Sequence, residues 1–162
     1  MTAPKFECRG TARIDGPYRY DLWRIWGDPD GPYMLFCMLN PSTADASEDD
    51  ATIRRCIGFA RRARMDRLCV VNLYAWRATR PADLFKAQDP VGPMNDFWIS
   101  EHAKHAAQIV AAWGGEAKND RAFWVAYQLR RFNSLYCLGK TKYGCPKHPL
   151  YLSNNTVLSL YL

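Results

Sequence analysis

Three features that would indicate familiar classes of protein are missing from this sequence. There is no CxxC pair among its six cysteines, and three of them (Cys37, Cys69 and Cys137) lie inside apolar runs that are typical of strands. This spacing argues against a zinc site, and we expect no metal and no other cofactor. The sequence also has no apolar stretch long enough to span a bilayer and no signal-peptide pattern. We therefore expect a cytoplasmic protein with reduced cysteines and no membrane contact.

The sequence also lacks internal repeats, low-complexity tracts and any stretch typical of a linker between domains. Of its 162 residues, 48% are hydrophobic and 14% are aromatic. A chain of this length buries about 70% of the surface that it exposes when unfolded, which is enough for a core. We therefore predict one domain over 1–162, made of a hairpin extension (1–31), a core (32–152) and a tail (153–162) whose role the sequence does not indicate.

Acidic residues are in the minority, because Asp and Glu number 16 against 22 Lys and Arg, which gives a formal net charge of +6. A basic surface attracts polyanions, so nucleic acid is the expected partner. The alternative is a solvated cationic face that binds nothing. The charge alone does not separate the two.

Strand and helix patterns alternate along the chain. The continuous apolar run at 33–39 is typical of a strand covered on both faces, and similar runs follow it. Ser47 and Asp50 resemble a capping box, and apolar residues at helical spacing follow them. Earlier, two alternating segments around the turn Asp15-Gly16 predict an antiparallel hairpin. The expected elements are hairpin strands at 11–14 and 18–26, core strands at 33–39, 68–71, 109–113 and 135–138, and helices at 47–64, 94–107 and 120–131.

This alternation predicts an α/β fold, a three-layer α/β/α sandwich around a four-stranded parallel sheet, with the hairpin added at the N-terminal end. In open α/β sheets, ligands bind outside the carboxyl ends of the strands. Polar or glycine residues follow the predicted strands, which places a functional site at that edge. These residues are Asn40, Pro41 and Ser42 after the first strand, Asn72 after the second, Gly114 after the third, and the segment up to His148 after the fourth.

Each of these residues has a functional and a structural interpretation. Asn40 precedes Pro41 and is restricted to extended geometry, so its amide can project from the strand end, or the segment is a plain turn. The amide of Asn72 closes an apolar strand and either reads a planar base or joins a buried hydrogen-bond network. His148 is either catalytic or a structural or exposed histidine.

Basic and aromatic residues are interleaved after the fourth core strand. Lys140, Lys142 and Lys147 alternate with Tyr143 and Tyr151, a pattern suited to phosphate contact and base stacking. We predict that the three lysines contact nucleic-acid phosphates.

Four further residues are expected near the same edge. Arg54 on the first helix is predicted to contact phosphate, and Arg77 after the second core strand is predicted to contact the substrate, since guanidinium groups bind phosphate through paired donors. Salt bridges to nearby acidic residues are the alternative for both. Tyr74 and Trp76 offer rings on which a base would stack.

Several motifs together resemble an uncharacterised bacterial and phage family of unknown function, over roughly residues 10–152. This resemblance carries no established activity. The motifs lie at 38–45 (MLNPSTAD), 50–56 (DATIRRC), 71–73 (VNL), 92–96 (GPMND) and 147–152 (KHPLYL).

The order of the motifs is also similar to the uracil-DNA glycosylase superfamily. In the mismatch-specific branch, a Gly-Ile-Asn-Pro-Gly motif follows the first core strand and its asparagine positions the attacking water, which implies that role for Asn40. In the uracil-specific branch, an asparagine that ends the second strand reads the base edge, which implies that role for Asn72. A Leu-Trp-Gly segment resembles Ala112-Trp113-Gly114, and a late His-Pro-Ser-Pro-Leu motif resembles the segment that begins at His148.

The sequence departs from that superfamily at three places. No glycine precedes Asn40, the catalytic aspartate of the uracil-specific branch is absent, and the late motif lacks its serine and second proline. The resemblance therefore supports a fold more strongly than an activity.

The sequence predicts a protein that binds a nucleobase or nucleic acid, in its catalytic form a DNA glycosylase for a modified or mismatched base. Asn40 and His148 are the predicted catalytic residues, and Pro41, Ser42, Asn72 and Gly114 are predicted substrate contacts. Two alternatives stay open: a nucleic-acid-binding module without chemistry, and an enzyme that acts on a free nucleotide or nucleoside.

Overall fold

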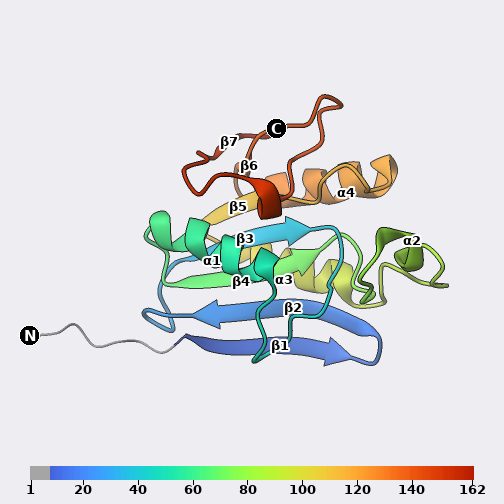
Figure 1. Cartoon of the computed structure of the whole chain (residues 1–162), viewed down its shortest axis with the longest axis horizontal. Coiled ribbons are helices and arrows are strands. Elements are labelled where there is room, and N and C mark those ends of the chain that lie inside the picture. The colour runs from blue at the N-terminus through green and yellow to red at the C-terminus, as the bar shows by residue number, and fades with distance from the viewer. Residues whose placement is uncertain (1–7) are drawn as a thin grey trace, which may run out of the picture.

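A seven-stranded mixed sheet forms the centre of the molecule (Figure 1). The computed structural model describes residues 8–162. The strand order is β1-β2-β4-β3-β5-β6-β7. The strands are β1 (Arg9–Asp15), β2 (Tyr18–Ile25), β3 (Tyr33–Met38), β4 (Arg67–Asn72), β5 (Gln108–Ala111), β6 (Leu135–Cys137) and β7 (Ser159–Leu160).

The α/β class is confirmed, but a separate four-stranded sheet is wrong. Strands β4, β3, β5 and β6 pair in parallel, and antiparallel strands extend this group on both sides. The hairpin joins through β2, which pairs with β4 from Leu22 to Ile25, and the tail joins through β7, which pairs with β6. Unpaired backbone groups at the edges of the parallel strands are thereby covered, which is the physical reason for the larger sheet.

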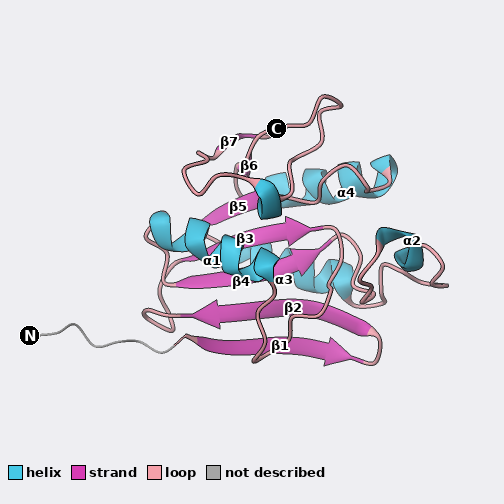
Figure 2. Cartoon of the chain, viewed as in Figure 1, coloured by secondary structure: helices cyan, strands magenta, loops and turns pink. Residues whose placement is uncertain are grey.

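Helices cover both faces of the sheet (Figure 2). Helix α1 (Ala51–Arg62) packs on one face, where its apolar side chains meet Met34 and Phe36 of β3. Helices α3 (Asn95–His105) and α4 (Asn119–Arg130) pack on the other face, against Leu35 and Cys37. Alternate residues of β3 thus enter opposite cores, as a strand buried on both faces requires.

The ends of the helices differ slightly from prediction. Helix α1 begins after Asp50 rather than Ser47, because the Asp50 carboxylate accepts a hydrogen bond from the Ile53 N–H (2.8 Å). Ser47 instead bonds the side chain of Asp45 within the preceding loop. The segment at 74–93, between the predicted strand at 68–71 and the predicted helix at 94–107, contains the short helix α2 (Pro81–Leu84), and a 3₁₀ turn, η1, spans Pro149–Tyr151.

The connections place a crevice between the carboxyl ends of β3 and β5. From β3 the chain crosses through α1 to β4 on one side, and from β5 it crosses through α4 to β6 on the other. Because α1 and α4 lie on opposite faces, the loops diverge between these two neighbouring strands, as at the ligand sites of open α/β sheets. No helix among residues 8–162 has the length and apolar character that crossing a bilayer requires.

Candidate functional site

A pocket of about 500 Å³ opens at this crevice. It lies at the carboxyl ends of β3, β4 and β5 and is closed by the first turn of α1 and by the start of η1. The size is within the range of small-molecule sites. Five predicted residues line it together: Asn40, Ser42, Asn72, Gly114 and His148.

The backbone holds the side chain of Asn40 in one orientation. Its Nδ2 donates to the carbonyl oxygens of Pro41 (3.0 Å) and Ala78 (2.7 Å). Because an amide nitrogen has two hydrogens to donate, both are used, and Oδ1 is left as an acceptor at the pocket. Pro41 itself is buried and contributes its carbonyl to this arrangement rather than a surface of the pocket.

Asn72 is the last residue of β4, and its buried side chain has an unused hydrogen-bond donor in the described part of the chain. Its exposure is 1%, and Nδ2 finds no hydrogen-bond partner among the described residues. The amide of Asn95 bonds the main-chain carbonyls of Asn72 (2.9 Å) and Leu73 (3.1 Å), so the backbone is fixed while the Asn72 side chain stays free. A buried donor without a partner is costly, which is the expected condition of a group reserved for a ligand.

His148 is held by the turn that follows it. Its Nδ1 accepts a hydrogen bond from the Leu150 N–H (3.2 Å), and burial lowers the pKa of the imidazole. The ring is therefore neutral near pH 7 and carries its proton on Nε2, a donor. Gly114 lies against it with φ +73°, and its N–H bonds the Pro146 carbonyl (2.9 Å), which ties this segment to the end of β5.

Three charged residues of the pocket, Arg19, Asp50 and Glu116, were not predicted as site residues. Arg19 on β2 is only 3% exposed, donates from Nη1 to the Ala44 carbonyl (2.5 Å), and has no partner for Nε within residues 8–162. Burial lowers the pKa of Arg19 to about 10. Asp50, expected only as part of a helix start, also lines the pocket, and one of its carboxylate oxygens caps α1.

A β-bulge places Arg19 on the face of β2 opposite to the one that the sequence pattern predicts. On β2, Leu22 packs toward α1, and strict alternation would put position 20, not 19, on the same face. The pairing with β1 shifts at this point, because Arg13 opposes Asp21 while Ile14 opposes Arg19, so Tyr20 is the extra residue. The bulge reverses the alternation and turns Arg19 to the pocket.

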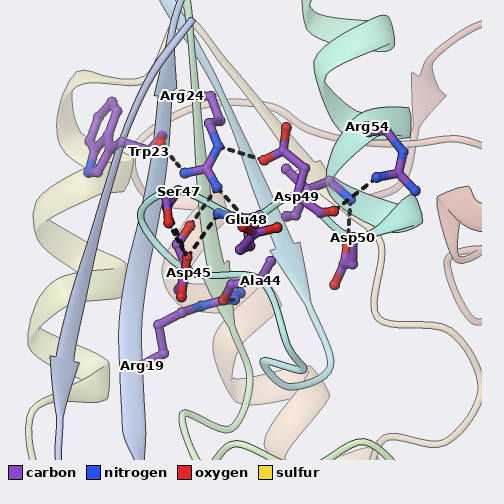
Figure 3. A network of polar contacts seen from close by, with 11 residues as sticks. Arg19, Trp23, Arg24, Ala44, Asp45, Ser47, Glu48, Asp49, Asp50 and Arg54 are labelled. Atoms are coloured by element: carbon purple, nitrogen blue, oxygen red, sulfur yellow. Dashed lines mark hydrogen bonds and ion pairs between the residues drawn. The ribbon is translucent and has the colours of Figure 1, made fainter.

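The loop between β3 and α1 is tied down by a second buried arginine of β2 (Figure 3). Arg24 pairs with the carboxylate of Asp49 (2.7 Å) and donates to the carbonyls of Asp45 and Glu48. The Asp45 carboxylate in turn accepts from the main-chain N–H groups of Ser47 and Glu48, both at 2.9 Å. The hairpin thus positions the loop that carries one wall of the pocket.

The predicted aromatic contacts and Arg77 do not line the pocket. The ring of Tyr74 is buried edge-on against Phe85 (5.3 Å between centroids), and Trp76 packs on Tyr18 (5.6 Å). The main chain of Arg77 bonds the Pro17 carbonyl.

The predicted phosphate contacts also lie outside it. Arg54 is exposed and donates to the Asp49 carbonyl (2.9 Å). Lys140 and Lys142 lie over the rings of Tyr161 and Tyr143, and the stem of Lys147 lies beside Gly139. These four cationic side chains therefore lie at the exposed surface, outside the pocket. In residues 8–162, no three His, Cys, Asp or Glu side chains gather as metal ligands would.

Comparison with known proteins gives one match. A family model described as "Protein of unknown function (DUF1643)" matches residues 19–150, a range that contains every residue lining the pocket. No curated protein and no solved structure matches the chain.

Proposed function

The chain belongs to the DUF1643 family, whose function is unknown, and we propose that its pocket binds a nucleobase and hydrolyses the bond between that base and its sugar. One observation carries the proposal: Asn40, Asn72 and His148, which lie at or beyond the ends of three different core strands, line a single pocket. The remote likeness to the uracil-DNA glycosylase superfamily supports the proposal, because residues at these places in that superfamily read a base and position water.

Asn72 is the proposed reader of the base. A side-chain amide presents a donor and an acceptor in one plane, which complements the edge of a pyrimidine or purine. A base that accepts a hydrogen bond would satisfy the unpartnered Nδ2 of Asn72. Trp113, which also lines the pocket and is 2% exposed, provides the aromatic contact in place of Tyr74 and Trp76.

Asn40 and Asp50 would act on water. The free Oδ1 of Asn40 accepts a hydrogen bond from the water, and the Asp50 carboxylate takes up its proton as the water oxygen bonds to the sugar carbon. The bond from that carbon to the base nitrogen breaks at the same time, and the base leaves with the electron pair. Asp50 thus supplies the basic group that an asparagine cannot be.

His148 would stabilise the departing base. Because its Nε2 carries a proton while the ring is neutral, it donates a hydrogen bond to the oxygen on which negative charge develops. The base then takes a proton from solvent.

One observation favours a free nucleotide or nucleoside as the substrate instead of DNA. Arg54 and the three lysines predicted to contact DNA phosphates do not line the pocket, so nothing in its wall requires a polymer. Under this alternative, affinity depends little on the length of the nucleic acid.

The test is a panel of DNAs that carry deaminated, mismatched and phage-modified bases, with the corresponding free nucleotides in parallel. Abasic sites and released base are scored for the wild type, for Asn40→Ala, and for the matched control Asn155→Ala, an exposed asparagine outside the pocket. We expect release by the wild type and the control, and a loss of about 100-fold or more in Asn40→Ala. Absence of release from every substrate, with Asn40→Ala equal to the wild type in binding, would refute the proposal.

A further inference from the structure

We propose that the end of the pocket formed by Arg19 and the first turn of α1 binds a phosphate group of the ligand. This inference rests on the proposed function, because it names the part of a nucleobase-bearing ligand that lies beyond the base. It assigns the phosphate to a buried arginine of the hairpin rather than to the surface lysines.

Arg19 carries a buried positive charge. It forms no ion pair among the described residues, and Nη1 alone has a hydrogen-bond partner there. Arg24, equally buried at 3% exposure, pairs with Asp49 and bonds three main-chain carbonyls. A buried cation is costly unless an anion and hydrogen bonds compensate it. The charge of Arg24 is balanced inside the protein by Asp49, whereas Arg19 lines the open pocket.

Further hydrogen-bond donors lie around the same opening. The main-chain N–H groups of Ala51 and Thr52 precede the first intrahelical bond of α1, and both residues line the pocket. Arg19, which is 3% exposed and lines the same pocket, adds an Nε donor that has no hydrogen-bond partner among the described residues. A phosphate offers several acceptor oxygens, and a guanidinium matches them through paired donors.

Asp50 opposes this site and makes it testable. Its carboxylate lies in the pocket and supports the Arg19 charge from a distance, so an incoming phosphate is repelled by it. Asparagine also caps helices, which means that Asp50→Asn removes the repulsion while it keeps α1 in place. We therefore expect Asp50→Asn to bind phosphate more tightly than the wild type.

Calorimetric titration of the full chain tests the inference. The probes are inorganic phosphate, deoxyribose 5-phosphate, the deoxynucleoside monophosphates of adenine, guanine, cytosine, thymine and uracil, their nucleosides, and a short single-stranded oligonucleotide. The variants are Arg19→Gln, Arg19→Lys, Asp50→Asn, and Arg9→Gln as a control at an exposed position of β1. Thermal unfolding verifies that each is folded, and Arg19→Lys with Asp50→Asn test the site if Arg19→Gln does not fold.

We expect a monophosphate to bind at least about tenfold more tightly than its nucleoside, because a charged hydrogen-bonded contact is worth that much. Arg19→Gln should remove this advantage and leave nucleoside binding unchanged, and Arg9→Gln should retain it. A preference for the mononucleotide assigns the phosphate to a free nucleotide, whereas tighter binding of the oligonucleotide that also depends on Arg19 assigns it to a DNA strand.

The two proposals fail in different ways. Nucleoside binding without any phosphate advantage, or an advantage that survives in Arg19→Gln and Arg19→Lys, overturns the phosphate site and leaves the base pocket standing. Arg19-dependent binding of deoxyribose 5-phosphate, without added affinity from any base, supports the phosphate site and overturns the base pocket.

Discussion

Hydrogen bonds to main-chain groups fix the side chains of His148 and Asn40. The contribution of these bonds to stability can be measured separately from any catalysis. His148 is a half-buried, neutral imidazole, and Asn40 is an amide with both hydrogens bonded to main-chain carbonyls. Each arrangement favours one chemical form of the side chain. Changes of pH or of side-chain type therefore report on the geometry of the pocket without any knowledge of its ligand.

The lowered pKa of His148 predicts a loss of stability in acid. In the unfolded chain a histidine titrates near pH 6.5, and in the folded protein burial opposes the charge. The unfolded state therefore binds more protons as the pH falls below about 6.5, and the free energy of unfolding decreases until the folded histidine also titrates. Urea unfolding at pH 7.5 and pH 5 should show a smaller acid-induced decrease for His148→Gln than for the wild type.

His105, an exposed histidine at the end of α3, provides the control. His105→Gln should retain the acid-induced decrease of the wild type. An equal decrease in His148→Gln and the wild type would show that His148 is not buried as a neutral ring.

Asn40 predicts an ordering of variants. Asn40→Ala removes two hydrogen bonds and leaves the Pro41 and Ala78 carbonyls without this donor, for a loss of about 1–3 kcal/mol in the free energy of unfolding. Asn40→Asp should lose more, because it places a carboxylate against the same two carbonyls. Denaturant unfolding near pH 7 measures both, and an aspartate variant as stable as the wild type would mean that the amide is not held in this orientation.

At the scale of elements, the start of α1 depends on the charged side chain of its own cap residue, and the loop before it depends on a charged side chain of β2. Asp50 caps α1, and Arg24 of β2 holds the preceding loop (Figure 3). The sequence predicts the buried strands and the main helices well, because apolar runs and helical spacing are local signals. It misplaces the cap at Ser47, since Asp and Ser are both good caps and only the turn of the loop decides between them.

The cap assignment is tested by two alanine variants. Asp50→Ala should lower the free energy of unfolding by about 0.5–2 kcal/mol, as other N-cap deletions do. Ser47→Ala, in an exposed part of the loop, should change it by less than about 0.5 kcal/mol. Chemical unfolding of both measures the difference, and a larger loss for Ser47→Ala would restore the cap predicted from the sequence.

At the scale of the whole molecule, both ends of the described chain become strands of the sheet. The sequence predicts the hairpin but not that it pairs with β4, and it indicates no role for 153–162, because edge pairing depends on contacts far apart in the chain. The same limit applies to the site. The ends of the predicted strands indicate that Asn40, Asn72 and His148 lie together, but Arg19 faces the same pocket because of a β-bulge that the sequence does not reveal. Tyr74 and Trp76 follow β4 closely, but their rings turn into packing contacts instead.

The tail therefore has a predicted structural effect. Removal of residues 159–162 uncovers the edge of β6 and deletes Tyr161, whose ring packs edge-on against Trp113 (5.8 Å). We expect a lower melting temperature and self-association that grows with protein concentration, because an open strand edge pairs with other chains. Melting curves and light scattering over a range of concentrations measure these effects, and an unchanged, monodisperse truncated chain would show that β7 contributes little to the sheet.

We propose that one pocket presents Asn40, Asn72 and His148 to a nucleobase. The most direct measurement is nuclear magnetic resonance of the protein with nitrogen-labelled asparagine, titrated with the nucleoside or nucleotide that binds most tightly. We predict saturable shifts of the Asn72 and Asn40 side-chain amide signals at one common dissociation constant, and no shift for the exposed Asn155. Saturation without movement of the Asn72 signal, or shifts confined to asparagines outside the pocket, would show that the nucleobase does not bind at these side chains.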